Sequence, residues 1–215
     1  MAVRSSFNHK QALSKEFSGE NSARNRIIAG ARRHFFAYGL RGVTMDDLAK
    51  ELGMSKKTLY AHFPSKMALL KAVLLNKLHN IEADLEQITS SCSSDFPTAL
   101  RQLLACIQKH SDEAQPPFVR DVGGEAWEQV KSIQTQGRHV IYRQFGKFLD
   151  EGQKAGIIRA DIPTKLVIEI LLGARDAIMN PEKLSELEIM PNIAVGAIIT
   201  VILEGVITET GRTSL

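Results

Sequence analysis

Apolar residues recur with helical spacing along most of the chain, and the pattern is densest between residues 44 and 63. Four apolar residues there lie at i, i+3, i+4 and i+7 and give a short helix one apolar face: Met45, Leu48, Ala49 and Leu52. Thr44 is the predicted N-cap of this helix, and Gly53 is its predicted left-handed stop. This stretch is the segment around which the chain is organised.

A second short helix is predicted to begin two or three residues later. Ser55 is placed as its N-cap, Leu59 and Phe63 face inward, and Pro64 ends it. The opposite face is basic, hydroxylic and small, with these residues: Lys56, Lys57, Thr58, Tyr60 and Ala61. Such a face fits the major groove of DNA, where lysines reach phosphates or guanine and small side chains reach base edges.

The same periodicity predicts helices along the rest of the chain, and no segment favours a strand. A first helix is predicted from an N-cap at Ser22 to Tyr38. The later predicted helices are separated by Ser-, Gly- and Pro-containing breaks and cover residues 65–90, 95–110, a short turn to 120, 125–155, 163–178 and 191–208. We therefore predict an all-α protein with nine or ten helices.

The length of 215 residues is enough for a small and a medium-sized domain. The most apolar run, residues 193–207, includes Glu204 and is shorter than the roughly 20 residues that a bilayer requires. No leader-like segment opens the sequence. We expect a cytosolic protein with no membrane partner.

The sequence contains no motif that indicates an enzyme, a cofactor or a metal. Cys92 and Cys106 have neither metal-ligand nor redox spacing, and no two of the six histidines lie three or four residues apart. Nucleophile elbows, P-loops and dinucleotide-binding glycine patterns are also missing. We expect no catalytic residues, no cofactor and no metal site.

Charge is distributed unevenly along the chain. Residues 1–80 carry 14 Lys and Arg against 5 Asp and Glu, a net charge of +9. The remaining residues carry 13 against 19, a net charge of −6. A solvated charged face is one explanation, but a basic segment that coincides with two short helices indicates a nucleic-acid reader attached to another domain.

Residues 27–74 resemble the N-terminal DNA-binding domain of TetR-type transcriptional regulators. The similarity covers an apolar helix ending in Tyr-Gly, the segment T-M-x-x-L-A-x-x-L-G-M-S, then T-L-Y-x-H-F and P-S-K. It implies a three-helix helix-turn-helix domain followed by a larger helical domain for effector binding and dimerisation. The expected divisions are a flexible arm at 1–21, the DNA-binding domain at 22–66 and the second domain at 67–215.

The resemblance implies a repressor that binds a palindromic, double-stranded operator and is released by a small-molecule effector. Lys66 begins the next helix and could hold a phosphate, while His62 could contact phosphate or stack on the end of its helix. The expected DNA-contacting residues are Arg24, Arg26, Thr44, Ser55, Lys56, Lys57, Thr58, Tyr60, Ala61, His62 and Lys66.

The effector is expected between the helices that precede the last two long ones. Aromatic and apolar residues with a few polar groups are typical of such pockets, although each also fits a plain core. The candidates are Phe96, Leu103, Cys106, His110, Phe118, Trp127, Arg138, Tyr142 and Phe145. An effector-independent or architectural DNA-binding factor is the alternative, and a second domain packed solid between the fourth and seventh helices would favour it.

The last two long helices are more apolar than one buried face requires, which favours a homodimer interface. A monomer with both helices central to its core is the alternative. The expected interface residues are Leu166, Ile170, Gly173, Ala174, Val195, Ile198, Ile199, Ile202 and Val206.

Overall fold

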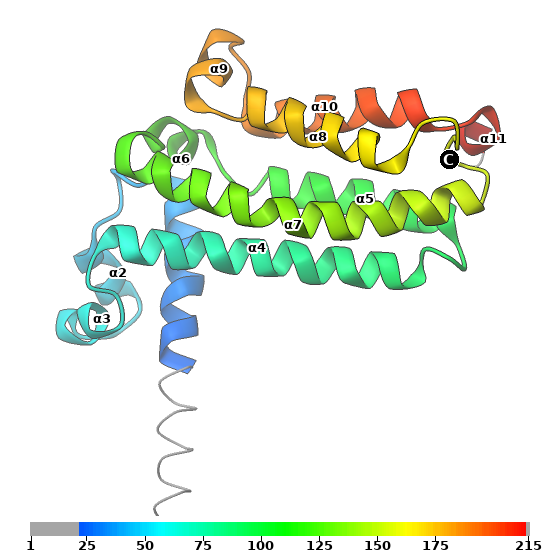
Figure 1. Ribbon diagram of the computed structural model, residues 1–215. Coiled ribbons are helices and arrows are strands. Elements are labelled where there is room, and N and C mark those ends of the chain that lie inside the picture. Colours follow the sequence, from blue (N-terminus) through cyan, green and yellow to red (C-terminus); the bar gives the residue numbers. More distant parts are fainter. Residues whose placement is uncertain (1–21, 214–215) are drawn as a thin grey trace, which may run out of the picture.

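A computed structural model describes residues 22–213 of the chain (Figure 1). Every regular element in this range is a helix, so the predicted all-α class is confirmed. The arm expected at residues 1–21 lies outside the described residues. No helix in the described range is long and apolar enough to cross a membrane.

The first three helices follow the predicted pattern closely. The first helix covers residues 22–38, and because Ser22 is already helical, the prediction that it caps the helix is wrong. Helices α2 (Met45–Glu51) and α3 (Lys56–His62) follow. Thr44 Oγ1 accepts the Asp47 N–H at 3.1 Å, while the Asp47 carboxylate accepts the Thr44 N–H at 3.3 Å. This reciprocal capping box fixes where α2 begins.

The turn between α2 and α3 depends on two residues. Gly53 has φ of +64°, a backbone conformation that costs glycine little and other residues more. Ser55 Oγ then accepts the Thr58 N–H at 3.0 Å and caps α3. The predicted stop and the predicted cap are both confirmed, and they set how α3 projects from α2.

The long helices that follow are stacked, with α4 below, α5 and α7 in the middle, and α8 and α10 above (Figure 1). Helix α4 packs against α5 and α7, while α8 and α10 pair above them and contact α7 and α5. The bounds are α4 Lys66–Ser91, α5 Phe96–Ser111, α6 Pro116–Asp121, α7 Gly124–Lys154, α8 Thr164–Ile178, α9 Pro181–Glu186, α10 Pro191–Val206 and α11 Glu209–Thr213.

The last long helix, α10, ends slightly earlier than the sequence predicts. Helix α10 stops at Val206, and Ile207 is extended and pairs with Ile158 instead of continuing the helix. Arg159 N donates to Val206 O at 2.8 Å, and Thr208 N donates to Ile157 O at 2.8 Å. These long-range backbone bonds outweigh the local helical pattern and lead into the short helix α11.

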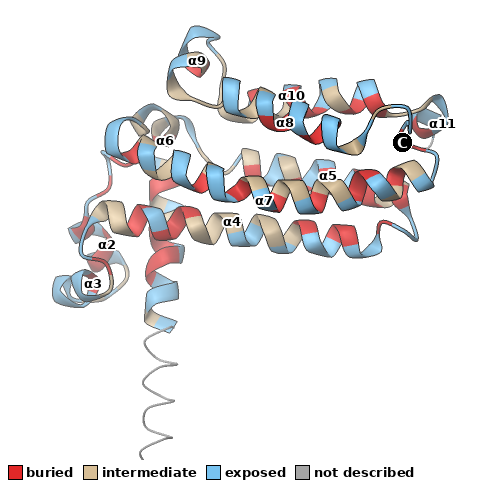
Figure 2. Ribbon diagram, in the orientation of Figure 1, coloured by how far each residue is buried: buried red, intermediate tan, exposed pale blue. Residues whose placement is uncertain are grey.

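Buried residues form two apolar clusters (Figure 2). The N-terminal cluster contains Ile27, Phe35, Leu48 and Leu59, but it continues into the first turns of α4, into α6 through Phe118 and into the start of α7. The second cluster joins α4, α5, α7, α8 and α10. The apolar core of the three N-terminal helices therefore crosses the predicted domain boundary at 66/67, as expected of a bundle too small to be stable alone.

Candidate DNA-binding surface and ligand cavity

Helix α3 presents the face that the sequence predicts. Its anchor Leu59 is fully buried, while Lys56, Lys57, Thr58 and Ala61 are exposed. Tyr60 is 46% exposed although its ring is large and apolar. One buried side chain thus holds the helix, and the remaining surface is free for contact with a partner.

Two of the expected DNA-contacting hydroxyls already have structural roles. Thr44 Oγ1 donates to Asp47 Oδ2 at 2.5 Å as well as capping α2. Ser55 Oγ lies 2.8 Å from Thr58 Oγ1 and caps α3. Both hydroxyls are exposed, and a hydroxyl oxygen has two lone pairs, so capping leaves some hydrogen-bonding capacity for a phosphate.

The two lysines of α3 differ in their surroundings. Lys56 Nζ donates to Asp46 Oδ2 at 2.5 Å, and this hydrogen bond raises the pKa of Lys56. Lys57 has no ion-pair or hydrogen-bond partner for its ammonium among residues 22–213. A DNA phosphate must therefore compete with Asp46 for Lys56, whereas it can bind Lys57 without displacing another group.

The two arginines of the first helix contact the helix-turn-helix segment. Arg24 lies over the ring of Phe63, with its guanidinium carbon 5.0 Å from the ring centre. Arg26 Nη2 donates to Leu52 O at 3.2 Å, at the end of α2. These contacts hold both arginines beside α2 and α3, and each guanidinium keeps further donors.

The last two expected DNA-contacting residues flank Pro64. His62 lies in the last turn of α3 and Lys66 in the first turn of α4, and both are partly buried. Burial lowers the pKa of Lys66, and the carboxylate of Asp121 partly offsets this effect. Ser65 caps α4 by accepting the Ala68 N–H at 3.1 Å, which places Lys66 beside the exposed amides of that helix.

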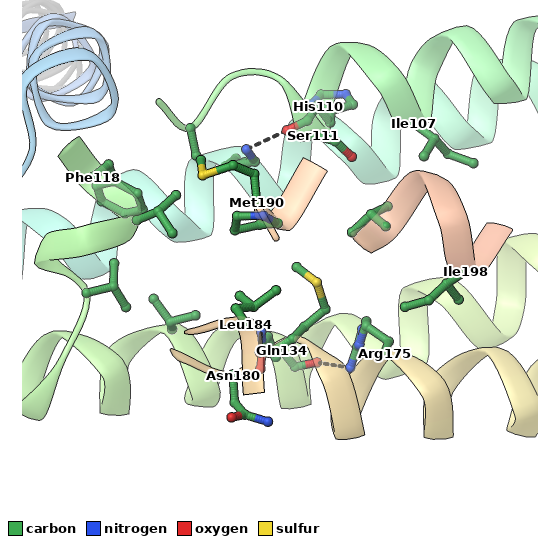
Figure 3. Close-up of a pocket in the computed structure, with 18 of the residues that line it drawn as sticks. Ile107, His110, Ser111, Phe118, Gln134, Arg175, Asn180, Leu184, Met190 and Ile198 are labelled. Atoms are coloured by element: carbon green, nitrogen blue, oxygen red, sulfur yellow. Dashed lines mark hydrogen bonds between the residues drawn. The ribbon is translucent and has the colours of Figure 1, made fainter. Parts of the chain in front are cut away.

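A cavity of about 930 Å³ lies in the second part of the molecule (Figure 3). Helices α4, α5, α6, α7, α8, α9 and α10 all contribute to its lining, and so does Phe36 of the first helix. Five of the nine expected effector residues line it: Cys106, His110, Phe118, Trp127 and Phe145. The wall also contains residues that were not predicted from the sequence, from α8, α9 and the cap of α10, among them Arg175, Leu184 and Met190.

The other four expected effector residues lie elsewhere. Phe96 packs on Phe148 with ring centres 4.6 Å apart, and Leu103 is 2% exposed in the core. Arg138 pairs with Asp176 and Glu169 on the outside of the helices. Tyr142 is half-buried against the second cluster.

The cavity wall is mostly apolar, with a few polar groups. Lys77 Nζ donates to His110 O at 2.8 Å, and Arg175 Nη2 donates to Gln134 O at 3.3 Å (Figure 3). Burial lowers the pKa of Lys77, which the Glu113 carboxylate partly offsets. Apolar walls with a few convergent polar groups are typical of small-molecule sites.

Lys77 also connects the cavity to the first helix. Its ammonium lies 3.1 Å from Glu113 Oε2 and 4.9 Å from the ring centre of Phe36. Arg32 of the first helix binds the same carboxylate in bidentate fashion, with its Nη2 2.9 Å from Glu113 Oε2. Burial would raise the pKa of Glu113, but the Arg32 hydrogen bond and the charge of Lys77 lower it. A cavity residue and a residue of the N-terminal helices therefore share one carboxylate.

Helix α6 is a second connection between the cavity and the N-terminal helices. Gln115 N donates to Phe36 O at 3.0 Å, and the ring of Phe36 meets that of cavity-lining Phe118 edge to face, with centres 4.8 Å apart. Arg41 N donates to Asp121 Oδ2 at 2.7 Å. Helix α6 therefore contacts both the last turn of the first helix and the loop that follows it.

Helices α8 and α10 carry an exposed apolar face. Leu166 and Ile170 are each 51% exposed, and Val201 is 71% exposed. Gly173, Gly196 and Gly205 have open space where a Cβ would lie. Three expected interface residues, Ile198, Ile199 and Val206, face the core of their own chain instead, because α10 must also cover α5. Exposed Ile193 and Val201 were not in the expected set.

The fold also brings together three side chains that the sequence analysis did not group. The ligand atoms of Asp84, Cys106 and His110 all lie within 4.8 Å of one another. Cys106 and His110 are four residues apart on α5, a spacing that a search for His–His and Cys–Cys pairs misses.

Comparison with known proteins supports the interpretation of the N-terminal helices as a DNA-binding helix-turn-helix. Residues 27–73 match the family described as "Bacterial regulatory proteins, tetR family". The HTH-type transcriptional regulator SrpR of Pseudomonas putida is 38% identical over 61 residues, which cover 28% of this chain and 29% of SrpR. The aligned part spans only a quarter to a half of the length of SrpR and two similar regulators.

Two longer matches extend the similarity into the second part. The HTH-type transcriptional repressor KstR2 of Rhodococcus jostii is 27% identical over 161 residues, covering 72% of this chain and 76% of KstR2. The structure of the SmeT–triclosan complex has a TM-score of 0.59 at 16% identity and covers 87% of this chain and 93% of SmeT. The predicted resemblance to TetR-type regulators is therefore confirmed, and the chain has their fold: an N-terminal helix-turn-helix followed by a larger helical part.

Proposed function

We propose that this protein is a DNA-binding transcriptional repressor of the TetR type, released from its operator by a small molecule. The observation that carries the proposal is α3: a helix anchored by one buried leucine, capped by Ser55, with an unpaired Lys57 and an exposed Tyr60 on its outer face. A recognition helix of this kind reads the major groove. The regulators similar to this chain support the proposal, and an enzymatic role has no comparable support.

In this proposal residues 22–66 read DNA and residues 67–215 bind the effector and form the dimer. Lys57, Lys66, Arg24 and Arg26 position the domain on phosphates, and Thr58 and Ala61 face base edges. The protein acts in the cytoplasm, where its operator lies.

An unbiased selection from a random DNA library tests the DNA side, because it needs no knowledge of where the operator lies. We expect an inverted repeat whose half-sites are centred about 34 to 36 Å apart, one helical turn, or a multiple of that distance. Affinity for the selected duplex should fall steeply with salt. Recovery of no shared sequence, with equally weak binding to selected and unrelated duplexes, would overturn sequence-specific reading.

The dimer is proposed to form through the exposed apolar face of α8 and α10. Four of its exposed residues, Leu166, Ile170, Ile193 and Val201, leave a large apolar area in water. A two-fold pairing of this face would cover them and match a palindromic operator. Sedimentation of the wild type should give a dimer at micromolar concentration.

A charge on this face tests the dimer. Ile170→Glu should shift sedimentation toward the monomer with an unchanged helical circular dichroism spectrum, because the residue is 51% exposed in the single chain. Leu104→Glu on α5, where Leu104 is 38% exposed, is the matched control and should remain a dimer. A monomeric wild type, or monomerisation by the control alone, would contradict this arrangement.

The cavity supports effector control over an effector-independent factor. A pocket of about 930 Å³ with a mostly apolar wall has the size that small-molecule sites usually have. The SmeT complex shows a protein of the same fold with triclosan bound. To release DNA, the effector must favour the DNA-incompetent conformer by about 3 to 5 kcal/mol.

The route from the cavity to α3 is proposed to pass through α6 and Glu113. A ligand against Phe118 or Lys77 displaces groups that bind Phe36 and Arg32 of the first helix. The two recognition helices then lose the separation that the half-sites require. The dye 1-anilinonaphthalene-8-sulfonate is a suitable probe of the cavity and should bind the wild type. Val130→Trp places a larger side chain in the cavity and should weaken binding of the dye.

A further inference from the structure

Asp84, Cys106 and His110 form a compact group of metal-ligating side chains beside the cavity. Asp84 projects from α4, and Cys106 and His110 project from α5. His110 Nε2 lies 2.9 Å from Asp84 Oδ2, and all three ligand atoms lie within 4.8 Å of one another. Cys106 and His110 are both 8% exposed, so most of the surrounding surface is protein.

The types of ligand indicate which ion would fit. Thiolate, imidazole and carboxylate are the usual protein ligands of Zn²⁺, with bonds of about 2.0 to 2.3 Å. Two ligands four residues apart on one helix face can chelate a single ion, as in helical zinc motifs. Donor atoms around a tetrahedral ion lie closer together than 4.8 Å, so the proposed binding requires these side chains to move towards the ion.

The position of the group also determines what remains open. Cys106 and His110 both line the cavity, whereas Asp84 lies behind them on α4. Three protein ligands leave one tetrahedral position free, as in zinc sites that bind water or a substrate.

We infer that Asp84, Cys106 and His110 form a binding site for one Zn²⁺ ion. Binding converts the Cys106 thiol to a thiolate and releases its proton to solvent. His110 binds through Nε2 as a neutral imidazole, and Asp84 binds through Oδ2 in place of its present hydrogen bond to the ring. The ion thereby cross-links α4 and α5.

Two positively charged lysines lie beside the proposed site and lower its affinity for a cation. Lys109 Nζ lies 2.9 Å from Asp84 Oδ2, and Lys77 Nζ contacts the backbone oxygen of His110. The ion must displace Lys109 from the carboxylate, which the long and exposed lysine side chain can accommodate by turning to solvent. Lys77 is held by Glu113 and keeps its place.

Co²⁺ is the probe for this site, because a thiolate–Co²⁺ bond gives a charge-transfer absorption band that aspartate and histidine cannot produce. The chelator-treated full chain should bind one Co²⁺ per chain with this band, and Zn²⁺ should remove the band by displacement. Cys106→Ser should abolish the band. Cys92→Ser is the matched control, since Cys92 is also buried but lies outside the group, and it should keep the band.

A second variant keeps the test meaningful if Cys106→Ser fails to fold. Asp84→Asn retains the thiol and should bind Co²⁺ at least tenfold more weakly, and Zn²⁺ should raise the melting temperature of the wild type more than that of Asp84→Asn. Absence of the band in the folded wild type, or its loss in Cys92→Ser with retention in Cys106→Ser, would overturn the inference. None of these measurements uses DNA, so their failure leaves the operator proposal untouched.

Discussion

The N-terminal helices and the cavity region use the same kind of element in opposite ways. Around α2 and the first helix the packing is close: Ile27, Ala31, Phe35 and Leu59 are fully buried, and a Cβ on Gly30 would lie 2.7 Å from Leu52 Cδ2. The second part leaves about 930 Å³ unfilled between its helices. A DNA reader must hold its shape before it binds, whereas a ligand-binding part can leave volume for its ligand to occupy.

The largest expected effect comes from truncating the α3 anchor. Leu59→Ala should lower the free energy of unfolding by about 2 to 5 kcal/mol, because it removes a fully buried side chain from a tightly packed cluster. Ile107→Ala, on the cavity wall, should cost less than about 2 kcal/mol, because that side chain already lacks neighbours on one side. Chemical denaturation of both variants measures the difference, and equal losses would mean that the two regions are packed alike.

Adding volume should show the same contrast between the two regions. Ala31→Leu places three extra carbons where no space exists and should cost about 1 to 3 kcal/mol. Ala114→Leu adds the same atoms at the cavity wall and should leave stability nearly unchanged. Thermal unfolding of both proteins checks this prediction. A melting temperature lowered as much by Ala114→Leu as by Ala31→Leu would show that the cavity is not available space.

A smaller loss of stability is expected from a substitution at Glu113, where the N-terminal helices and the cavity region meet. The pKa of Glu113 is lowered in the folded protein, so its contribution to stability is present above its unfolded pKa, about 4.3, and is lost as the pH falls through the folded value. At pH 7, Glu113→Gln should cost about 1 to 2 kcal/mol, since it leaves Lys77 and Arg32 without their carboxylate.

The pH profile separates this ion pair from simple packing. The difference between wild type and Glu113→Gln should shrink as the pH falls from 5 towards 3, because the wild-type carboxyl becomes protonated. Urea unfolding at several pH values measures it. A difference that stays constant across this range would mean that Glu113 acts through its shape and not through its charge.

The contrast between the regions also explains what the sequence could predict. The caps Thr44 and Ser55 and the stop at Gly53 act within a few residues, so local chemistry determines them and they can be predicted from the sequence. The outward face of α3 could be predicted in the same way. Leu59 is the buried residue of this helix, and helical geometry then determines which residues face outward.

Features that depend on distant segments were harder to predict. Phe96 and Leu103 have the helical spacing of wall residues, yet Phe148 and the second cluster enclose them. Arg175 and Met190 reach the cavity only because α8 and α10 fold back over α5 and α7. The pairing of Ile207 with Ile158 ends α10 early for the same reason.

Fluorescence anisotropy on the selected operator duplex, over a series of salt concentrations, tests the central claim most directly. We predict that Lys57→Ala weakens binding and lowers the salt slope by about one unit, and that Tyr60→Phe costs about 0.5 to 3 kcal/mol. Lys147→Ala, an exposed lysine of α7, should bind as the wild type does. Unchanged affinity and salt slope in both α3 variants would contradict the claim that this helix reads DNA.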